Sequence, residues 1–307
     1  MRTALLFSGQ GSQYVGMMKD LTTSYTHANE LVSVADKILG IELSDICFNG
    51  PAETLKETRY TQPALFLHSA VLTDLLKQKI EFHAVAGHSV GEYSALYAAG
   101  VLSFENALNL VAFRGELMFN AGKYESGTMF AVINLSDEKV VEVCKNLTDE
   151  SKGLYVVPAN YNSPGQIVVS GSAEHLRNNV DAFKQAGARL VKELVVSGAF
   201  HSPLMEPAKQ ELERKILNTE FSDAKVPVYV NFTAKPLVKS EDIKEALIAQ
   251  LTSPVLWTQT LSNMKTDGIY RYIELGPGKV LQGLVKRSIS GVEIDGIDKA
   301  EDILKYF

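Results

Sequence analysis

The sequence has little cysteine and no excess of positive charge. Its 307 residues include only two cysteines, Cys47 and Cys144, which lie far apart in the chain. Neither a disulfide framework nor a metal site built from cysteine and histidine is therefore expected. The 36 acidic residues outnumber the 30 Lys and Arg residues, which gives a formal net charge of −6. Such a surface does not favour the phosphate backbone of nucleic acids, so we expect no nucleic-acid partner.

Long hydrophobic runs are also absent, although 46% of the residues are hydrophobic. The longest apolar runs fall far short of the length that spans a membrane. The chain opens on an apolar segment, residues 3–7, without the basic region, long apolar stretch and small-residue cleavage site of a signal peptide. We therefore expect a cytoplasmic protein with no membrane partner. Its length allows one large domain or two domains of unequal size.

Apolar, strand-like segments alternate with helical periodicity over most of the chain, which predicts an α/β fold with a parallel sheet. Outside the middle of the chain, the expected strands cover residues 3–7, 84–87, 226–230 and 269–275. The expected helices there cover residues 25–39, 62–79, 91–99, 203–218 and 243–251. One more helix, capped by Ser103, is expected to reach residue 121.

The segment between Glu125 and Val196 has a different pattern. Strands are expected at residues 128–133, 154–159, 166–170 and 189–196, and helices at residues 137–146 and 173–186. This β-α-β-β-α-β order is the ferredoxin-like pattern. We therefore expect a small ferredoxin-like subdomain over residues 125–196. The larger catalytic α/β subdomain is expected to combine residues 1–124 and 197–307.

Residues 87–91 read Gly-His-Ser-Val-Gly and lie between an expected strand and an expected helix. In that setting a G-x-S-x-G sequence predicts a sharp turn that exposes the Ser89 oxygen beside a helix N-terminus. The N–H of Val90 would then point at an oxyanion formed from a substrate carbonyl. The alternative is a tight turn with an inert serine. The strand before the motif and the helix after it favour the nucleophile.

A serine nucleophile needs a base, and the chain has six histidines. His88 is adjacent to Ser89, so on a sharp turn its side chain should diverge from the serine oxygen and pack. His68 sits in an apolar helix, as a core histidine would. His201 lies in a loop between an expected strand and an expected helix, at the sheet edge where functional sites gather, and its position makes it the favoured base. The remaining three are expected in solvated helical stretches or a loop: His27, His175 and His83.

The residues Gly9-Gln10-Gly11 follow the first expected strand and are candidates for the second donor of an oxyanion hole. Glycines there let backbone N–H groups approach a ligand closely. A dinucleotide or phosphate loop is the alternative. It fits poorly, because Tyr14 stands where the G-x-G-x-x-G pattern needs glycine and the lysine of a P-loop is missing.

Five motifs in one order carry a resemblance to a known family. They are Gly9-Gln10-Gly11-Ser12-Gln13, Gly87-His88-Ser89-Val90-Gly91-Glu92, Arg114-Gly115, Asn162-Ser163-Pro164-Gly165-Gln166 and Gly198-Ala199-Phe200-His201-Ser202. Together they resemble malonyl-CoA:acyl carrier protein transacylases, free-standing bacterial acyltransferases of fatty acid synthesis. Acyltransferases of polyketide pathways are similar. The resemblance extends to Glu274-Leu275-Gly276-Pro277-Gly278 and so covers nearly the whole chain.

This resemblance implies a fold and a set of site residues. The fold would be an α/β-hydrolase-like core with a ferredoxin-like insertion, in agreement with the expected element order. Ser89 would be the acylated nucleophile and His201 its base. The N–H groups of Gln10 and Val90 would form the oxyanion hole. Family members lack the usual acidic third residue, and the backbone carbonyl matching Gln250 would orient the histidine instead.

The resemblance also assigns two residues to substrate selection. Arg114 matches the arginine that pairs with the free carboxylate of malonate, since a planar guanidinium can donate two parallel hydrogen bonds to a carboxylate. Without the family, a surface salt bridge would be the default interpretation of Arg114. Phe200, before the histidine, matches the pattern associated with malonyl rather than branched methylmalonyl groups. Val90 stands where leucine is frequent in the family, which matters little because the N–H does the work.

The substrate implied is malonyl-CoA, and the acceptor is the phosphopantetheine thiol of an acyl carrier protein. No bound cofactor is implied, and we expect a monomer. Two alternatives stay open, an acyl-thioester hydrolase of a polyketide pathway and an inactive acyltransferase-like scaffold. Arg114 argues against the hydrolase, since acyl hydrolases that resemble this family typically lack it. Weak candidates for carrier docking are Lys184, Arg189, Lys192, Lys286 and Arg287.

Overall fold

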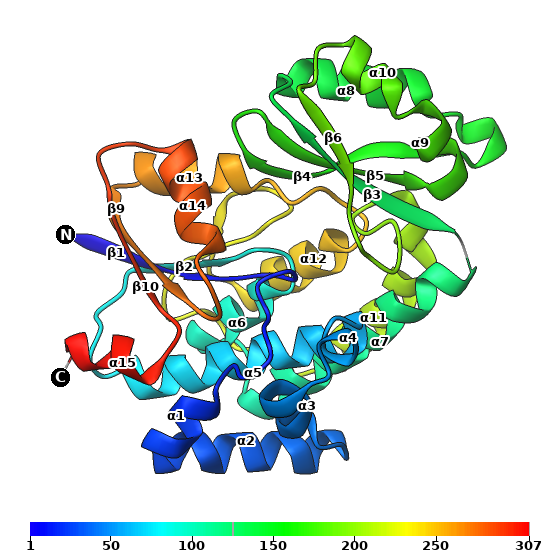
Figure 1. Ribbon diagram of the computed structural model, residues 1–307. Helices are drawn as coiled ribbons and strands as arrows, with labels where there is room; N and C mark the ends of the chain where they lie inside the picture. The colour runs from blue at the N-terminus through cyan, green and yellow to red at the C-terminus, as the bar shows by residue number, and fades with distance from the viewer. Residues whose placement is uncertain (125, 307) are drawn as a thin grey trace.

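Two separate β-sheets organise the chain, and helices pack against both (Figure 1). The computed structural model describes residues 1–124 and 126–306. The larger sheet has the strand order β10-β9-β1-β2-β7-β8. Its strands are β1 (Arg2–Phe7), β2 (Ala84–Gly87), β7 (Val228–Tyr229), β8 (Pro236–Leu237), β9 (Ile269–Leu275) and β10 (Glu293–Ile297). All neighbours pair in parallel except β7 and β8, so the carboxyl ends of β1, β2, β7, β9 and β10 share one edge.

The larger sheet is buried on both faces, as a mostly parallel sheet requires. Side chains alternate along β1, so Leu5 and Phe7 join one hydrophobic core while Ala4 and Leu6 join another. The first face packs against α5 (Thr58–Leu76) and α6 (Gly91–Ala98), with α2 (Thr26–Leu39) and α7 (Phe104–Tyr124) outside them (Figure 1). The second face packs against α13 (Trp257–Thr266) and α14 (Val280–Ser288).

The smaller sheet is antiparallel throughout and has the strand order β4-β5-β3-β6. Its strands are β3 (Gly127–Ile133), β4 (Val156–Ser163), β5 (Gln166–Ser172) and β6 (Leu190–Glu193). Three helices accompany it, α8 (Asp137–Leu147), α9 (Ala173–Asn179) and α10 (Asp181–Gln185), and a hydrophobic core separate from the other two lies beneath them. The β-α-β-β-α-β order predicted from the sequence is confirmed, with the second helix divided in two.

The remaining elements connect these layers. They are α1 (Lys19–Ser24), α3 (Leu43–Asn49), α4 (Ala52–Leu55), η1 (Glu150–Lys152), η2 (Pro203–Met205), α11 (Glu206–Leu217), α12 (Ser240–Gln250), α15 (Ala300–Ile303) and η3 (Leu304–Tyr306). In the part of the chain that the structure describes, no helix is both long and apolar enough to cross a membrane. Both cysteines, Cys47 and Cys144, are buried and unpaired.

Several boundaries differ from the sequence-based expectation. The long helix α5 begins at Thr58 rather than Gln62, so Pro63 lies inside it although proline favours a helix start. Nearly every side chain of α5 is buried, and this packing outweighs the local preference. The strands β7 and β6 are shorter than expected, while α13 and β10 were not expected. The subdomain boundary predicted at residue 125 lies outside the described residues, and the division at 125 and 196 stays a prediction.

Candidate active site

Ser89 lies at the turn that joins β2 to α6. Its backbone has φ 54, the left-handed region that a residue with a side chain seldom adopts. A Cβ on Gly87 would overlap the backbone of Gly91, and a Cβ on Gly91 would overlap the Phe7 carbonyl. The turn is therefore possible only because both flanking residues are glycine. The conformation is that of a nucleophile elbow, as the motif predicts.

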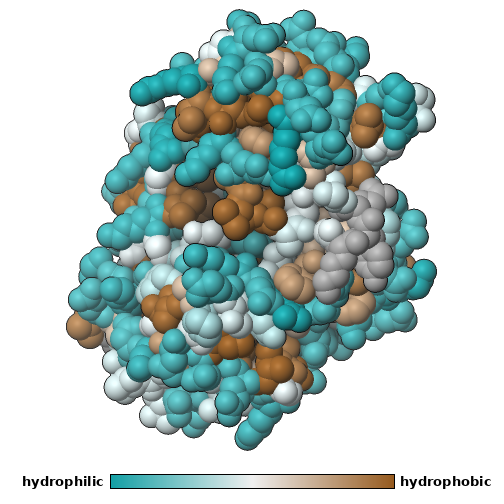
Figure 2. All heavy atoms as spheres, turned by 45° about the vertical axis from the view of Figure 1, so that its right-hand side comes forward, coloured by the Kyte–Doolittle hydropathy of each residue, from teal (hydrophilic) through white to brown (hydrophobic). Residues whose placement is uncertain are grey.

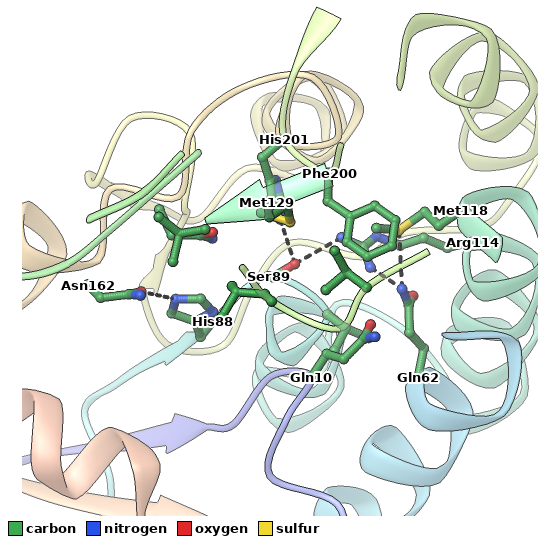
Figure 3. A pocket seen from close by; sticks show the side chains of 15 residues that line it. Gln10, Gln62, His88, Ser89, Arg114, Met118, Met129, Asn162, Phe200 and His201 are labelled. Atoms are coloured by element: carbon green, nitrogen blue, oxygen red, sulfur yellow. Dashed lines mark hydrogen bonds between the residues drawn. The ribbon is translucent and has the colours of Figure 1, made fainter. Parts of the chain in front are cut away.

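His201 contacts the Ser89 side chain directly. Its Nε2 lies 2.8 Å from Ser89 Oγ, and its Nδ1 lies 2.9 Å from the backbone oxygen of Gln250, the last residue of α12 (Figure 3). Since a carbonyl oxygen only accepts hydrogen bonds, Nδ1 carries the proton and Nε2 presents its lone pair to the serine hydroxyl. Burial, and then the charge of Arg114, lowers the pKa of His201 to about 3. The ring is therefore neutral near pH 7 and able to accept a proton.

Arg114 comes from α7 and is only 1% exposed, so the surface salt-bridge interpretation is wrong. Its Nη2 donates to Ser89 Oγ at 3.1 Å and its Nη1 donates to Gln62 Oε1 at 2.7 Å (Figure 3). Its Nη2 also donates to Gln250 Oε1 at 3.1 Å. All three acceptors are uncharged. The Nε of Arg114 has no hydrogen-bond partner in the described part of the chain. Burial lowers the pKa of Arg114, while Tyr93 and Glu92 oppose that shift.

A cavity of about 180 Å³ opens in front of these three residues. Its polar lining includes Gln10, Gln62, His88, Asn160 and Asn162, besides Ser89, Arg114 and His201. Its apolar lining comprises Val90, Met118, Met129, Val168, Leu194, Val196 and Phe200. Met129 and Val168 belong to the smaller sheet, so the cavity lies between the two sheets. Figure 2 shows the surface hollowed between the smaller-sheet region at the top and the larger region below, with hydrophobic side chains gathered there.

The other predicted site residues lie at the same place. Gln10 follows β1, and its side-chain Nε2 donates to Thr58 Oγ1 at 3.2 Å. Val90 directly precedes α6. Phe200 is 5% exposed and forms part of the cavity wall (Figure 3). The structure therefore brings together all seven residues singled out in the sequence, and the roles assigned to them stay predictions.

The remaining histidines partly follow expectation. His88 points away from the Ser89 oxygen, and its Nε2 lies 2.8 Å from Asn162 Oδ1 while its ring edge meets Trp257 (Figure 3). His68 is a fully buried core histidine, hydrogen-bonded to the Asp298 backbone oxygen at 2.8 Å. The expectation that His175 is solvated is wrong, because it is half-buried and donates to the backbone oxygen of Leu147 at 2.6 Å.

Three residues at the site were not found by sequence reasoning. Gln62 holds the Arg114 guanidinium from α5. Asn231 follows β7 and bonds the backbone on both sides of His88, accepting from Ser89 N at 2.7 Å and donating to Gly87 O at 2.6 Å. Glu92 accepts from Asn231 N at 2.8 Å, and burial raises its pKa to about 7. Glu92 is the last residue of the motif that contains Ser89, but sequence reasoning assigned it no role. No signal in the sequence indicated Gln62 or Asn231.

Comparisons with known proteins agree with this geometry. The family model described as "Acyl transferase domain" matches residues 4–302. A malonyl CoA-acyl carrier protein transacylase from Staphylococcus aureus is 41% identical over 302 residues, which are 98% of this chain and 97% of the relative. The enzyme of that description from Haemophilus influenzae is 40% identical over 293 residues, 94% of this chain and 93% of the relative.

Solved structures are similar over the full length. The crystal structure of an acyl carrier protein S-malonyltransferase from Vibrio cholerae matches with a TM-score of 0.95 and 38% identity, covering 100% of both chains. A malonyl-transacylase in complex with a type II PKS acyl-carrier protein matches with a TM-score of 0.94 and 36% identity, covering 100% of this chain and 99% of the other.

Proposed function

This chain belongs to the acyl transferase domain family. We propose that it moves a malonyl group from malonyl-CoA to the phosphopantetheine thiol of an acyl carrier protein, and that Ser89 carries the malonyl group in between. It is an acyltransferase with the α/β fold of its relatives. One observation carries the choice of cargo. A buried arginine with only uncharged hydrogen-bond partners lies against the nucleophile oxygen.

The first step is recognition of the malonyl carboxylate by Arg114. A buried cation whose hydrogen-bond partners are all uncharged is costly, and a carboxylate that enters the cavity supplies a charged partner. A guanidinium also donates two parallel hydrogen bonds to a carboxylate, which an acetyl group cannot accept. A diacid thioester is therefore favoured over a plain acyl thioester.

Acylation follows from the Ser89–His201 geometry. The Nε2 of His201 accepts the Ser89 proton while Oγ attacks the thioester carbonyl carbon. The oxyanion is held by the N–H groups of Gln10 and Val90. The C–S bond then breaks, and the departing CoA sulfur takes the proton from His201. In the second half of the cycle, the carrier thiol gives its proton to His201 and attacks the acyl-serine carbonyl. The ester bond to Ser89 then breaks, Oγ takes the proton back from His201, and the malonyl-carrier leaves.

Gln250 replaces the acidic residue found in many serine triads. Its carbonyl oxygen accepts from His201 Nδ1, which fixes the ring orientation and stabilises the imidazolium formed during acylation. Its side chain also binds Arg114 and donates from Nε2 to the Ser89 backbone oxygen at 3.0 Å. Gln250 therefore links the base, the carboxylate-binding residue and the nucleophile turn.

Phe200 restricts the acyl group. Its side chain is buried in the cavity wall and directly precedes His201. A ring at this point leaves room for malonyl but opposes the extra methyl of a methylmalonyl group.

We place the enzyme in the cytoplasm as a monomer with no bound cofactor. Carrier proteins are usually acidic, so docking would use exposed basic groups near the cavity. The five docking candidates predicted from the sequence are all exposed: Lys184, Arg189, Lys192, Lys286 and Arg287. Two of them already have a partner, since Lys184 pairs with Asp181 at 2.7 Å and Arg287 donates to Gln166 at 2.7 Å. The product feeds fatty acid or polyketide synthesis.

Transfer is tested by incubating the protein with malonyl-CoA and holo acyl carrier protein while measuring malonyl-carrier and free malonate separately. The proposal expects malonyl-carrier to form and free malonate to stay low. Free malonate released equally fast with and without carrier would instead identify a thioester hydrolase. No turnover and no acyl-enzyme would identify a scaffold.

A further inference from the structure

The backbone ladder of the larger sheet stops just before the nucleophile. Strands β2 and β7 pair in parallel, with Val85 opposite Val228 and Ala86 opposite Tyr229. Beyond Tyr229 the chain turns away, because the N–H of Val230 donates to Lys235 O. Backbone pairing therefore ends before the Ser89 turn.

The side chain of Asn231 continues that ladder. In a parallel pair, one residue donates to the carbonyl just before its opposite residue and accepts from the N–H just after it. Continuing the register by two residues places Asn231 opposite His88. Its Nδ2 donates to Gly87 O at 2.6 Å, and its Oδ1 accepts from Ser89 N at 2.7 Å. The side-chain amide thus makes the two bonds that a backbone peptide group would make at this place.

Asn231 is itself held on both sides. Its N–H donates to Glu92 Oε2 in the first turn of α6 at 2.8 Å, and its carbonyl accepts from Leu256 N at 3.1 Å. The residue is fully buried. It therefore ties the end of β7 both to the turn before Ser89 and to the helix after it.

We infer that Asn231 is a positioning residue for Ser89. Its side chain extends the hydrogen-bonded pairing of β2 and β7 by one residue and thereby holds Ser89 in its left-handed conformation. A non-glycine residue with positive φ persists only where its surroundings fix it. The half-buried Ser89 N–H and the buried Gly87 carbonyl also need partners, which no other side chain in the described part of the chain gives them. The inference rests on the proposed role of Ser89 as nucleophile.

The substitution Asn231→Asp separates positioning from mere packing, because the outcome depends on pH. A neutral carboxylic acid can still accept from Ser89 N–H and donate to Gly87 O. The ionised carboxylate cannot donate a hydrogen bond, and its negatively charged oxygen is repelled by the Gly87 carbonyl oxygen. Charged or titratable groups around this position are Glu92 on α6, Arg114 on α7, and the rings of His88 and His201. These residues are the same in both proteins, so a difference between the two pH profiles reports the carboxyl at position 231 together with its coupling to Glu92.

The experiment follows Ser89 acylation by malonyl-CoA in single turnover, using rapid quench and intact mass, from pH 5.5 to pH 9. At pH 5.5 the Asn231→Asp variant should acylate within several-fold of wild type. By pH 9 it should fall behind by about 100-fold, the loss typical of a reacting group displaced by about 1 Å. The matched control is Asn263→Asp, since Asn263 Nδ2 also donates to a backbone carbonyl, that of Ala234, away from Ser89. The control should follow the wild-type profile.

A second reagent keeps this inference separate from the proposed function. Phenylmethylsulfonyl fluoride modifies activated serines and needs no malonyl recognition. Its rate on Ser89 should show the same pH-dependent deficit in Asn231→Asp. If neither reagent labels Ser89 in the wild type, the nucleophile assignment fails and the inference fails with it. If wild type is labelled and Asn231→Asp follows it at every pH, only the inference is overturned.

Should Asn231→Asp not fold, a second variant tests the inference. Asn231→Ser keeps one of the two hydrogen bonds, so its acylation rate is expected to lie below that of wild type. A wild-type acylation rate in Asn231→Ser would overturn the inference.

Discussion

The two sheets contribute to the site in different ways. The larger sheet is parallel and buried on both faces, and the segments after its strands supply Ser89, Asn231 and the Gln10 loop. The smaller sheet is antiparallel, and its strands supply side chains of the cavity wall such as Met129 and Val168. The nucleophile turn is thus held by the parallel sheet, and the cavity wall comes in part from the antiparallel one. Variants on each side should separate rate from selectivity.

The largest effect is expected for Ser89→Ala, which removes the reacting oxygen on the larger-sheet side. Turnover should fall by about 10⁴-fold or more, and no malonyl adduct should form on the protein. Intact mass after incubation with malonyl-CoA checks this, with Ser94→Ala on α6 as the control. A malonyl adduct that persists on the Ser89→Ala variant would show that Ser89 is not the nucleophile.

Arg114→Ala should change selectivity as well as rate. Loss of the carboxylate-binding cation should lower kcat/KM for malonyl-CoA by about 10²- to 10³-fold, equivalent to about 3–4 kcal/mol. Acetyl-CoA, which has no free carboxylate, should be much less affected. Competition between the two thioesters measures the ratio, and Arg177→Ala, an exposed residue on α9, serves as control. An unchanged malonyl-to-acetyl ratio would place cargo selection elsewhere.

His201 should also leave a signature in the pH dependence of stability. Its folded-state pKa is lowered to about 3, below that of the unfolded chain, so unfolding takes up a proton between about pH 6.5 and pH 3. The free energy of unfolding should therefore fall as pH falls in this window, by up to about 1.4 kcal/mol per pH unit from this residue. Glu92 has the opposite sign, because its raised pKa of about 7 makes stability fall as pH rises from about 4.5 to 7.

Denaturant unfolding of wild type and His201→Gln at pH 7 and pH 4 isolates the histidine contribution, since Glu92 is common to both. The wild type should lose more stability than the variant on acidification. Equal losses in wild type and His201→Gln would mean that His201 is not held neutral by the fold.

The smallest effect is expected at the cavity wall. Phe200→Ala should raise the use of methylmalonyl-CoA relative to malonyl-CoA by about tenfold, because one methyl group in an apolar pocket is worth only 1–3 kcal/mol. Met129→Ala in the smaller sheet should also raise the use of methylmalonyl-CoA relative to malonyl-CoA, but by less than Phe200→Ala does. Both variants should keep the wild-type rate of Ser89 acylation by malonyl-CoA within several-fold. A large loss of that rate in Met129→Ala would contradict the division of labour between the sheets.

The sequence was most informative where function depends on local conformation. Ser89 was predictable because glycines on both sides of a serine between a strand and a helix specify the turn by themselves. His201 was predictable only by position, and Arg114 only through the family resemblance. Asn231 was not predictable, since its bonds to Gly87 and Ser89 depend on the register of two strands more than 140 residues apart. Side chains that act through such pairing leave no periodic signal in the chain.

The scarcity and burial of cysteine have a chemical consequence for an enzyme that works between two thiols. Any accessible thiolate of its own would compete with CoA and the carrier for the activated acyl group by thioester exchange. Burial raises the pKa of both Cys47 and Cys144 to about 12, so neither forms thiolate near neutral pH. The fold thereby keeps its own sulfur out of the exchange, and the acyl-Ser89 intermediate that we propose is an oxygen ester.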